Sequence, residues 1–242
     1  MSDTSSREIS GLVPRAALSV GQRDEMFALL DRHFSGVTRA QFADDLAAKN
    51  WVIELRRAGR LMGFSTLLAT TSVFEGRSIT ALYSGDTIVS PEAWNSPALF
   101  RAWIAGVKRI RSTLPAQPCH WLLLTSGFRT YRLLPLFWRE FTPRFDTRPS
   151  PIQQRLLVHL ANEHYGARFE AAAGLVRFPH PQRLRAPLAT VPTGRIRDPH
   201  IAHFLHLNPG HAEGDELVCL TEIDDANLTA AGRRMAGVPS PE

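Results

Sequence analysis

The sequence predicts an α/β fold, an α+β arrangement around one mixed β-sheet, and three observations point to this class. Two segments with apolar residues at helical spacing, 22–34 and 38–47, precede the first clear strands. Three runs rich in β-branched and aromatic residues follow over 51–89, separated by short turns, as in an antiparallel meander. A helical segment over 96–111 then leads to a buried apolar strand at 119–125. A connection of that length makes this strand parallel to the one before it.

The composition is ordinary for a globular domain. The chain has 242 residues, of which 44% are hydrophobic and 21% are charged, so it can bury a full core. No run approaches the roughly 18 apolar residues of a membrane-spanning helix. Residues 1–10 are polar and lack the apolar core of a secretory signal, so we expect a cytoplasmic protein without a membrane span.

The chain is basic, with a net charge of +5 and an isoelectric point of about 9.8. A basic protein can bind nucleic acid, and on charge alone this function stays open. Lysine occurs only at Lys49 and Lys108, however, and the arginines are dispersed along the chain. We therefore expect no nucleic-acid partner.

Two sets of residues could in principle bind a metal. Cys119 and Cys219 lie far apart in apolar runs, which predicts two buried free thiols. Four histidines cluster late in the chain: His200, His203, His206 and His211. Because no cysteine accompanies these histidines, we expect capping or polar-face roles for them and no metal site.

The central stretch begins with a hairpin formed by 51–55 and 61–74. A second turn leads to the strand Thr80–Val89, which contains a single glycine, Gly85. A glycine inside a strand is typical of a bulge, which leaves backbone groups free to bind something other than a neighbouring strand. Ser96-Pro97 then fits an N-cap followed by proline at the first helical position.

Beyond the strand at 119–125, a helical pattern over 128–141 continues in spite of Pro135. Prolines crowd the chain after residue 142, and the remaining elements read as helix, helix, strand and helix: 151–165, 198–208, 214–221 and 225–235. We divide the chain into a flexible leader, a core, and an extension packed on the same sheet: 1–14, 15–149 and 150–242.

The order of these elements resembles the GNAT superfamily of N-acyltransferases over roughly residues 15–145. The strand, turn and helix from Thr80 to Arg111 carry most of the resemblance. Most GNAT members have an arginine- and glycine-rich turn between that strand and helix, whereas residues 90–97 here read Ser-Pro-Glu-Ala-Trp-Asn-Ser-Pro. The resemblance implies a three-layer sandwich with a C-terminal extension, and an acyltransferase activity.

The resemblance also implies where an acyl donor would bind. In GNAT-like proteins the bulged strand splays from its parallel neighbour and pairs with the pantetheine arm of acyl-CoA, while the pyrophosphate lies at the N-terminus of the next helix. Thr125 and Ser126 join this site because ligands collect at the carboxyl ends of parallel strands. The donor-binding candidates are Thr87, Ile88, Val89, Asn95, Ser96, Ala98, Leu99, Thr125 and Ser126.

The donor itself stays open between two classes. The chain also resembles acyl-homoserine lactone synthases, relatives of the same fold that lack the glycine-rich turn and take their acyl group from an acyl carrier protein. The many arginines of this chain suit an acidic carrier surface. We therefore expect either acyl-CoA or an acyl carrier protein as donor, with no permanently bound cofactor.

Acyl transfer to an amine needs a base, a polarised thioester carbonyl and an acid for the leaving thiolate. Asp86 lies in mid-strand among apolar neighbours, where partial burial raises the pKa of a carboxyl group towards that of a usable base. A turn-capping or ion-paired aspartate is the alternative. Ser84, on the same face of the strand, either holds the acceptor or is incidental. The resemblance implies a tyrosine as the acid, for which Tyr131 is the candidate, with a core tyrosine as the alternative.

We therefore predict an enzyme that moves an acyl group to a small-molecule amine. The alternative is a non-catalytic GNAT-like module that binds a ligand or a protein, which the missing glycine-rich turn favours.

Overall fold

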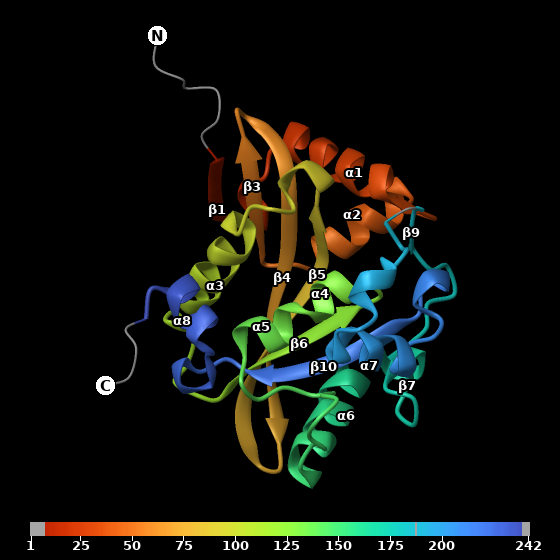
Figure 1. Ribbon diagram of the computed structural model, residues 1–242. Helices are drawn as coiled ribbons and strands as arrows, with labels where there is room; N and C mark the ends of the chain where they lie inside the picture. Colours follow the sequence, from red (N-terminus) through yellow and green to blue (C-terminus); the bar gives the residue numbers. More distant parts are fainter. Residues whose placement is uncertain (1–7, 187, 239–242) are drawn as a thin grey trace. The chain divides into compact units, whose positions relative to one another are not determined.

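The computed structural model describes residues 8–186 and 188–238 (Figure 1). The strands are hydrogen-bonded in the order β1-β3-β4-β5-β6-β10-β8-β7, and the predicted mixed α/β class is confirmed. The chain divides into two compact units. Unit 1 comprises 1–33, 37–69 and 84–116, and unit 2 comprises 34–36, 70–83 and 117–242. The long strands β4 (Arg60–Phe74) and β5 (Arg77–Val89) each contribute residues to both units.

Unit 1 contains the meander and three helices. Its other elements are β1 (Glu8–Pro14), α1 (Val20–His33), α2 (Arg39–Ala47), β3 (Trp51–Arg57) and α3 (Ala98–Arg111). The two-residue turn between β3 and β4 has positive φ at both Ala58 and Gly59, which matches the twist of an antiparallel hairpin.

Unit 1 has three layers, because β3 contacts a helix on each of its faces. On one face, Gly106 of α3 lies so close to β3 that a Cβ there would be 3.3 Å from Ile53. On the other face, the buried Glu54 interacts with α1. The three-layer arrangement expected for the core is thus present in this unit.

The N-terminal segment differs from the sequence prediction. We expected a flexible leader over 1–14, whereas Glu8–Pro14 form β1 and pair antiparallel with the whole of β3. Leu12 of this strand lies beneath α3, next to Gly106. Contact of the half-buried Leu12 with α3 and the backbone pairing with β3 order this segment. Residues 1–7 lie outside the described part of the chain.

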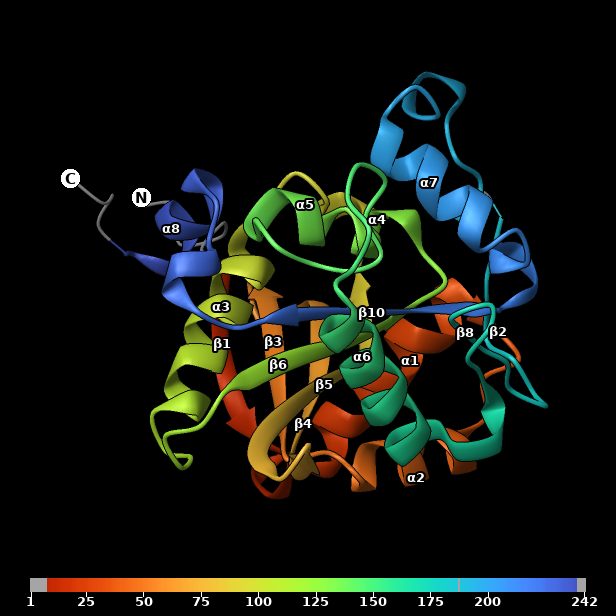
Figure 2. The same cartoon turned by 90° about the horizontal axis from the view of Figure 1, so that it is seen from below.

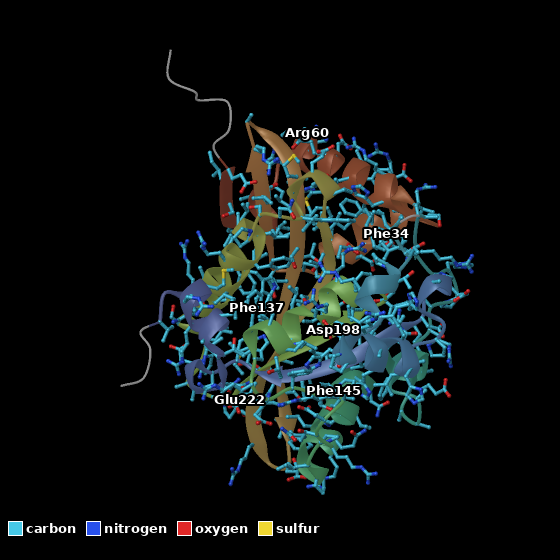
Figure 3. All side chains as sticks on the ribbon, viewed as in Figure 1. Phe34, Arg60, Phe137, Phe145, Asp198 and Glu222 are labelled. Carbon is cyan, nitrogen blue, oxygen red and sulfur yellow. The ribbon has the colours of Figure 1, made fainter. Side chains whose placement is uncertain are left out.

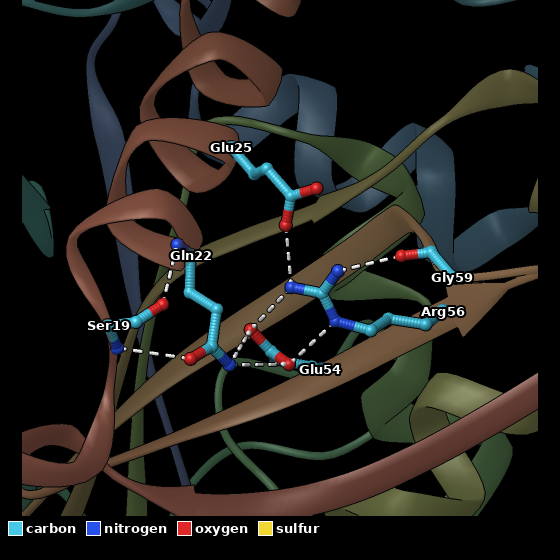
Figure 4. A network of polar contacts seen from close by, with 6 residues as sticks. All are labelled: Ser19, Gln22, Glu25, Glu54, Arg56 and Gly59. Atoms are coloured by element: carbon cyan, nitrogen blue, oxygen red, sulfur yellow. Dashed lines mark hydrogen bonds and ion pairs between the residues drawn. The ribbon is translucent and has the colours of Figure 1, made fainter.

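A buried ion pair fastens α1 to the sheet of unit 1 (Figure 4). The Glu54 carboxylate accepts hydrogen bonds from Nε and Nη2 of Arg56, at 3.0 and 3.2 Å, and weaker contacts at 3.4 Å from Gln22 of α1. Arg56 also donates to Glu25 of α1 at 2.7 Å and to the Gly59 carbonyl at 2.9 Å. One guanidinium group therefore holds the strand, its turn and the helix together.

Unit 2 contains an antiparallel set of strands. β10 (Glu216–Glu222) pairs with β6 (Cys119–Thr125) on one side and with β8 (Leu175–Val176) on the other, and β7 (Phe169–Glu170) follows. The Thr80 amide, near the start of β5, donates to the Pro118 carbonyl just before β6 at 2.8 Å, so these two strands begin side by side. Two short strands, β2 (Phe34–Ser35) and β9 (Arg183–Leu184), form a separate pair.

The core of unit 2 lies between this sheet and α6 (Pro151–Tyr165), which Figure 2 shows beside β6 and β10. A capping box formed by Ser150 and Gln153 begins α6. The buried core residues come from β5, β6, β10 and α6: Ile79, Ala81, Leu122, Leu124, Leu156, Leu157, Leu160, Val218 and Leu220. Both cysteines are buried, and no disulfide joins them.

The predicted helix over 128–141 is wrong in its length. The structure has two short helices, α4 (Phe128–Tyr131) and α5 (Leu133–Phe137), and the chain after α5 is extended. Pro135 accounts for the break, because its ring would collide with the carbonyl of Tyr131 in a continuous helix. The later helices α7 (Pro199–Leu207) and α8 (Ala230–Ala236) begin at side-chain caps from Asp198 and Thr229.

No helix among the described residues combines the length and hydropathy needed to cross a membrane.

We expect Gly63→Ala to lower the free energy of unfolding by about 2 kcal/mol, because an added Cβ would lie 2.7 Å from the Ile88 backbone carbonyl. The reason is steric, since β4 and β5 approach closely at this point. Gly11→Ala, also in a strand, is the matched control because nothing lies within 4 Å of its added Cβ. Urea denaturation of both variants checks this, and equal losses would contradict it.

Candidate functional site

Asp86 lies in the part of β5 that belongs to unit 1, and it points to the face of the sheet that carries α1 and α2. Its neighbour Thr87 shares a hydrogen bond of 2.9 Å with Ser65, which is paired with Ile53 on the α3 face. Because side chains alternate along a strand, Asp86 points the opposite way.

The residue Asp86 is half-buried, and protein surrounds its carboxyl group. This burial raises the pKa of Asp86 from 3.8 to about 6. A nearby positive charge on Lys49 opposes the rise, and Asp45 adds to it. A carboxylate with this pKa is ionised at neutral pH and is a better proton acceptor than an ordinary aspartate.

Lys49 follows the C-terminal end of α2 and is 9% exposed. Its ammonium group donates a hydrogen bond of 3.0 Å to the Asp45 carbonyl, where the helix dipole favours a positive charge. Burial lowers the pKa of Lys49, while the negative charges of Asp86 and Asp45 raise it. Sequence reasoning treated Lys49 only as part of the overall charge, because nothing local in the sequence links residues 49 and 86.

Thr66 is a second residue that sequence reasoning missed. Two contacts give the register of the antiparallel strands β4 and β5: the Met62 carbonyl accepts a hydrogen bond from the Ser90 amide, and the Ser65 hydroxyl contacts the Thr87 hydroxyl. In this register Thr66 lies across from Asp86. The Thr66 side chain is fully buried, and its hydroxyl has no hydrogen-bond partner among the described residues. A buried unpartnered hydroxyl is costly, which is typical of a group that binds a ligand or an ordered water.

Two predicted residues of β5 have structural contacts of their own. Ser84 is 1% exposed, on the same face as Asp86, so it is buried in the protein. The Val89 carbonyl accepts a hydrogen bond of 2.9 Å from the indole of Trp94. Since the Ser90 amide points to β4, the Val89 carbonyl points to the opposite edge of β5, and Trp94 covers that edge there.

The start of α3 carries a carboxylate that the sequence did not indicate. Ser96 donates a short hydrogen bond of 2.5 Å to Glu8 of β1 and accepts one of 3.2 Å from the Ala98 amide. Glu8 also binds Arg57, and the bonds to Ser96 and Arg57 lower the pKa of Glu8. An ionised side chain of the protein therefore lies at the position predicted for the donor pyrophosphate, while Asn95 is exposed and Leu99 is buried.

In unit 2, the segment after β6 is a tight turn. The Thr125 hydroxyl accepts a hydrogen bond from the Gly127 amide and contacts the Gly127 carbonyl, both at 3.0 Å. His211 forms a hydrogen bond with the backbone of Ser126 that raises its pKa, although burial has the larger, opposite effect. The assignment of Thr125 and Ser126 to a donor site stays a prediction.

Tyr131 of unit 2 is fully buried. Its hydroxyl donates to the Pro143 carbonyl at 2.9 Å, its ring contacts Phe141 and Phe204, and burial raises its pKa far above the ordinary value. These contacts fit the alternative of a core tyrosine. The chemistry proposed below therefore does not use Tyr131.

The late histidines are spread over unit 2. The His200 ring contacts the rings of Phe141 and Phe145, at centroid distances of 5.8 and 4.7 Å. Asp198, the N-cap of α7, and Phe145 are labelled in Figure 3. Burial lowers the pKa of His200 and His203. No group of three potential metal ligands occurs within residues 8–186 and 188–238.

No family model and no curated protein matches the chain. Solved structures of similar fold include a probable N-acyltransferase from Enterococcus faecalis, 14% identical, with a TM-score of 0.43 over 56% of this chain and 33% of that one. A GNAT family N-acetyltransferase from Escherichia coli, in complex with CoA, is 13% identical, with a TM-score of 0.40; the match covers 55% of this chain and 70% of that one. A GNAT family acetyltransferase from Brucella melitensis, in complex with acetyl-CoA, is 13% identical, with a TM-score of 0.34; the match covers 47% of this chain and 75% of that one.

The chain spans only a third of the length of the Enterococcus protein, with a coverage of 33%. The matched regions of the three proteins cover between 47% and 56% of this chain.

Proposed function

We propose that this protein transfers an acyl group from a thioester donor to an amine, with Asp86 as the general base. The observation that carries the proposal is a half-buried aspartate in mid-strand, with a carboxyl group whose pKa lies near 6. An acid in mid-strand is against propensity, and a base with a pKa close to the working pH transfers protons efficiently. The element order that resembles GNAT acyltransferases supports the same reaction class.

In the proposed reaction the amine nitrogen attacks the thioester carbonyl, a C–N bond forms and the C–S bond breaks. Asp86 takes the proton that the amine loses, directly or through a water molecule. The Thr66 hydroxyl lies across from Asp86, and we assign it to hold that amine or water. A thiol has an ordinary pKa of about 8.5, so the sulfur can leave as a thiolate near neutral pH without a dedicated acid.

The donor is an acyl-CoA or an acyl carrier protein, and the start of α3 bears on the choice. Glu8 places a negative charge beside Ser96, where the resemblance puts the diphosphate of CoA. Arg57, 36% exposed, partly neutralises it. The same carboxylate favours the second candidate function, a non-catalytic module of this fold, because it opposes the binding of a phosphorylated donor.

Calorimetric titration with acetyl-CoA, a longer acyl-CoA and an acyl carrier protein tests the proposal. We expect saturable binding of one donor class, and release of free thiol when a mixture of small amines is added. Glu8→Gln removes the competing charge and should tighten binding of the CoA donors. If no donor binds to the wild type or to Glu8→Gln, the proposed function is wrong. Binding without thiol release would favour the non-catalytic module.

A further inference from the structure

The solvent side of α3 in unit 1 concentrates positive charge. Its charged residues are all basic, and they form what we call the α3 basic stripe: Arg101, Lys108, Arg109 and Arg111. At 3.6 residues per turn, these four positions lie within about 160° of the helix circumference. The buried residues of α3 are apolar, apart from Gly106, and they pack on β1 and β3. The charged side of this helix therefore faces away from the sheet of unit 1.

Arg101 and Arg109 are the exposed members of the stripe. Neither guanidinium group forms a hydrogen bond or an ion pair within residues 8–186 and 188–238. By contrast, each arginine of the β3–β4 hairpin binds a carboxylate. The two unpaired arginines lie eight residues apart, about 12 Å along the helix axis, with the small, exposed Ala105 between them. Both charges are thus available to a partner, and a partner's backbone can come close between them.

The two faces of unit 1 carry opposite net charge. On one face, α1 and α2 together have three arginines and five carboxylates, a net charge of −2 with histidine neutral. On the other face, α3 has four basic residues and no acid, a net charge of +4. The positive potential of unit 1 is therefore strongest outside α3, where it attracts an anionic partner.

The chemistry of the stripe favours an acidic protein among the anionic partners. The aromatic residues of α3, Phe100 and Trp103, are half-buried and buried, so the stripe has no exposed ring to stack on a nucleic-acid base. The apolar side of α3 is covered by the sheet of unit 1, so the helix cannot insert into a bilayer. Carboxylates spaced along a helix of a partner protein can instead pair with Arg101 and Arg109 together.

We propose that the α3 basic stripe is the docking surface for an acidic acyl carrier protein, which delivers the acyl thioester. This inference rests on the proposed function for the identity of the partner, and it selects one of the two donor classes. Two features of the same helix lead to it. Unpaired positive charge along α3 attracts an acidic surface, and the Glu8 carboxylate at its start opposes the diphosphate of CoA. The thioester arm of a carrier protein is attached through a single phosphate, so this opposition is weaker.

The double variant Arg101→Gln, Arg109→Gln tests the docking surface. Calorimetry at low salt measures its binding to the acyl carrier protein encoded in the same genome, purified without an acyl group. We expect the dissociation constant to rise about tenfold, and binding to be lost in Arg101→Glu, Arg109→Glu, because like charges then meet. Binding of the wild type should weaken steadily as the salt concentration rises to about 0.5 M. Circular dichroism checks that the variants fold, and the single variants serve if a double variant does not.

The matched control is the double variant Arg23→Gln, Arg32→Gln. Both residues are exposed arginines of α1, on the other face of unit 1, and the change in net charge is the same. The neighbouring acids Asp24 and Asp31 already offset their charge. The dissociation constant of the control should stay within about twofold of the wild type. An equal loss of affinity in both double variants would show that only total charge matters, and would overturn the inference.

Two further results would overturn the inference. One is the absence of carrier binding to the wild type, and the other is tighter binding of a double-stranded oligonucleotide or of phosphatidylserine vesicles through the same two arginines. Because the carrier has no acyl group, docking is measured independently of turnover. Docking without acyl transfer would count against the proposed function alone, whereas transfer from acyl-CoA without docking would count against this inference alone.

Discussion

Replacement of Asp86 by asparagine is expected to reduce kcat for acyl transfer by about a thousandfold, the usual contribution of a general base. The amide has nearly the same size as the carboxyl group but cannot accept the proton of the attacking amine. Donor binding should change little, since the Asp86 side chain points to the face of the sheet opposite α3. Stopped-flow or single-turnover measurements of thiol release, together with calorimetry, check both parts.

Asp44→Asn is the matched control, because Asp44 is an exposed aspartate of α2 and undergoes the same chemical change. Its activity should equal that of the wild type. An Asp86→Asn variant with more than about a tenth of the wild-type kcat would exclude Asp86 as the base, given the usual size of that contribution.

The pH dependence follows from the raised pKa of Asp86. The wild-type rate should increase as the pH rises through about 6, because only the ionised carboxylate acts as base. The contribution of Asp86 to the free energy of unfolding should instead fall as the pH rises. The folded protein binds this proton more tightly than the unfolded chain, so the wild type loses stability relative to Asp86→Asn as the pH rises from 4 towards 6. Denaturation of both proteins at pH 4 and pH 7 measures this difference.

Arg56→Met is expected to lower the free energy of unfolding by about 3 kcal/mol, the largest effect on stability that we predict. The Glu54 side chain is 8% exposed, and removal of Arg56 would leave its charge without the guanidinium partner that binds both carboxylate oxygens (Figure 4). The variant also loses the bond from Arg56 to Glu25, which connects α1 to the sheet. Chemical denaturation monitored by circular dichroism measures the loss.

Arg60→Met is the control for this prediction, because Arg60 lies in the same hairpin and also forms an ion pair, with Glu92 at 3.3 Å. Unlike Glu54 and Arg56, both of these side chains are more than half exposed, at 57% and 59%. Its loss should be about 1 kcal/mol or less. In the double variant Glu54→Leu, Arg56→Met, no buried charge remains, so much of the stability should return. Equal losses in Arg56→Met and Arg60→Met would show that the Glu54 pair is not important for stability.

Local sequence patterns were sufficient to predict most of the long helices and strands. The strand predicted at 119–125 has the same bounds as β6, and the helix predicted over 151–165 has those of α6. Each of these segments carries its own signal, a continuous apolar run in the first and a capping serine with helical periodicity in the second. The helix predicted over 128–141 failed because a single proline outweighed the apolar pattern.

The strands that the sequence did not predict depend on partners far along the chain. Glu8–Pro14 are ordered by pairing with β3 and by contact of the half-buried Leu12 with α3, and neither interaction produces a periodic sequence pattern in seven residues. The short strands β7, β8 and β9 contain two residues each, too few for any periodicity. Their conformation follows from the neighbours with which they pair.

The sequence by itself determined the mixed α/β class, the order of the main elements and the candidate base in mid-strand, because these depend on short-range periodicity, on turn residues and on an acid where apolar residues are expected. Only the tertiary structure decided which charges meet. Thr66 lies across from Asp86, the charge of Lys49 acts on Asp86, and Glu8 binds Ser96 from 88 residues away. Electrostatic interactions depend on distance in space and on burial, and neither quantity can be read from the spacing of residues along a chain.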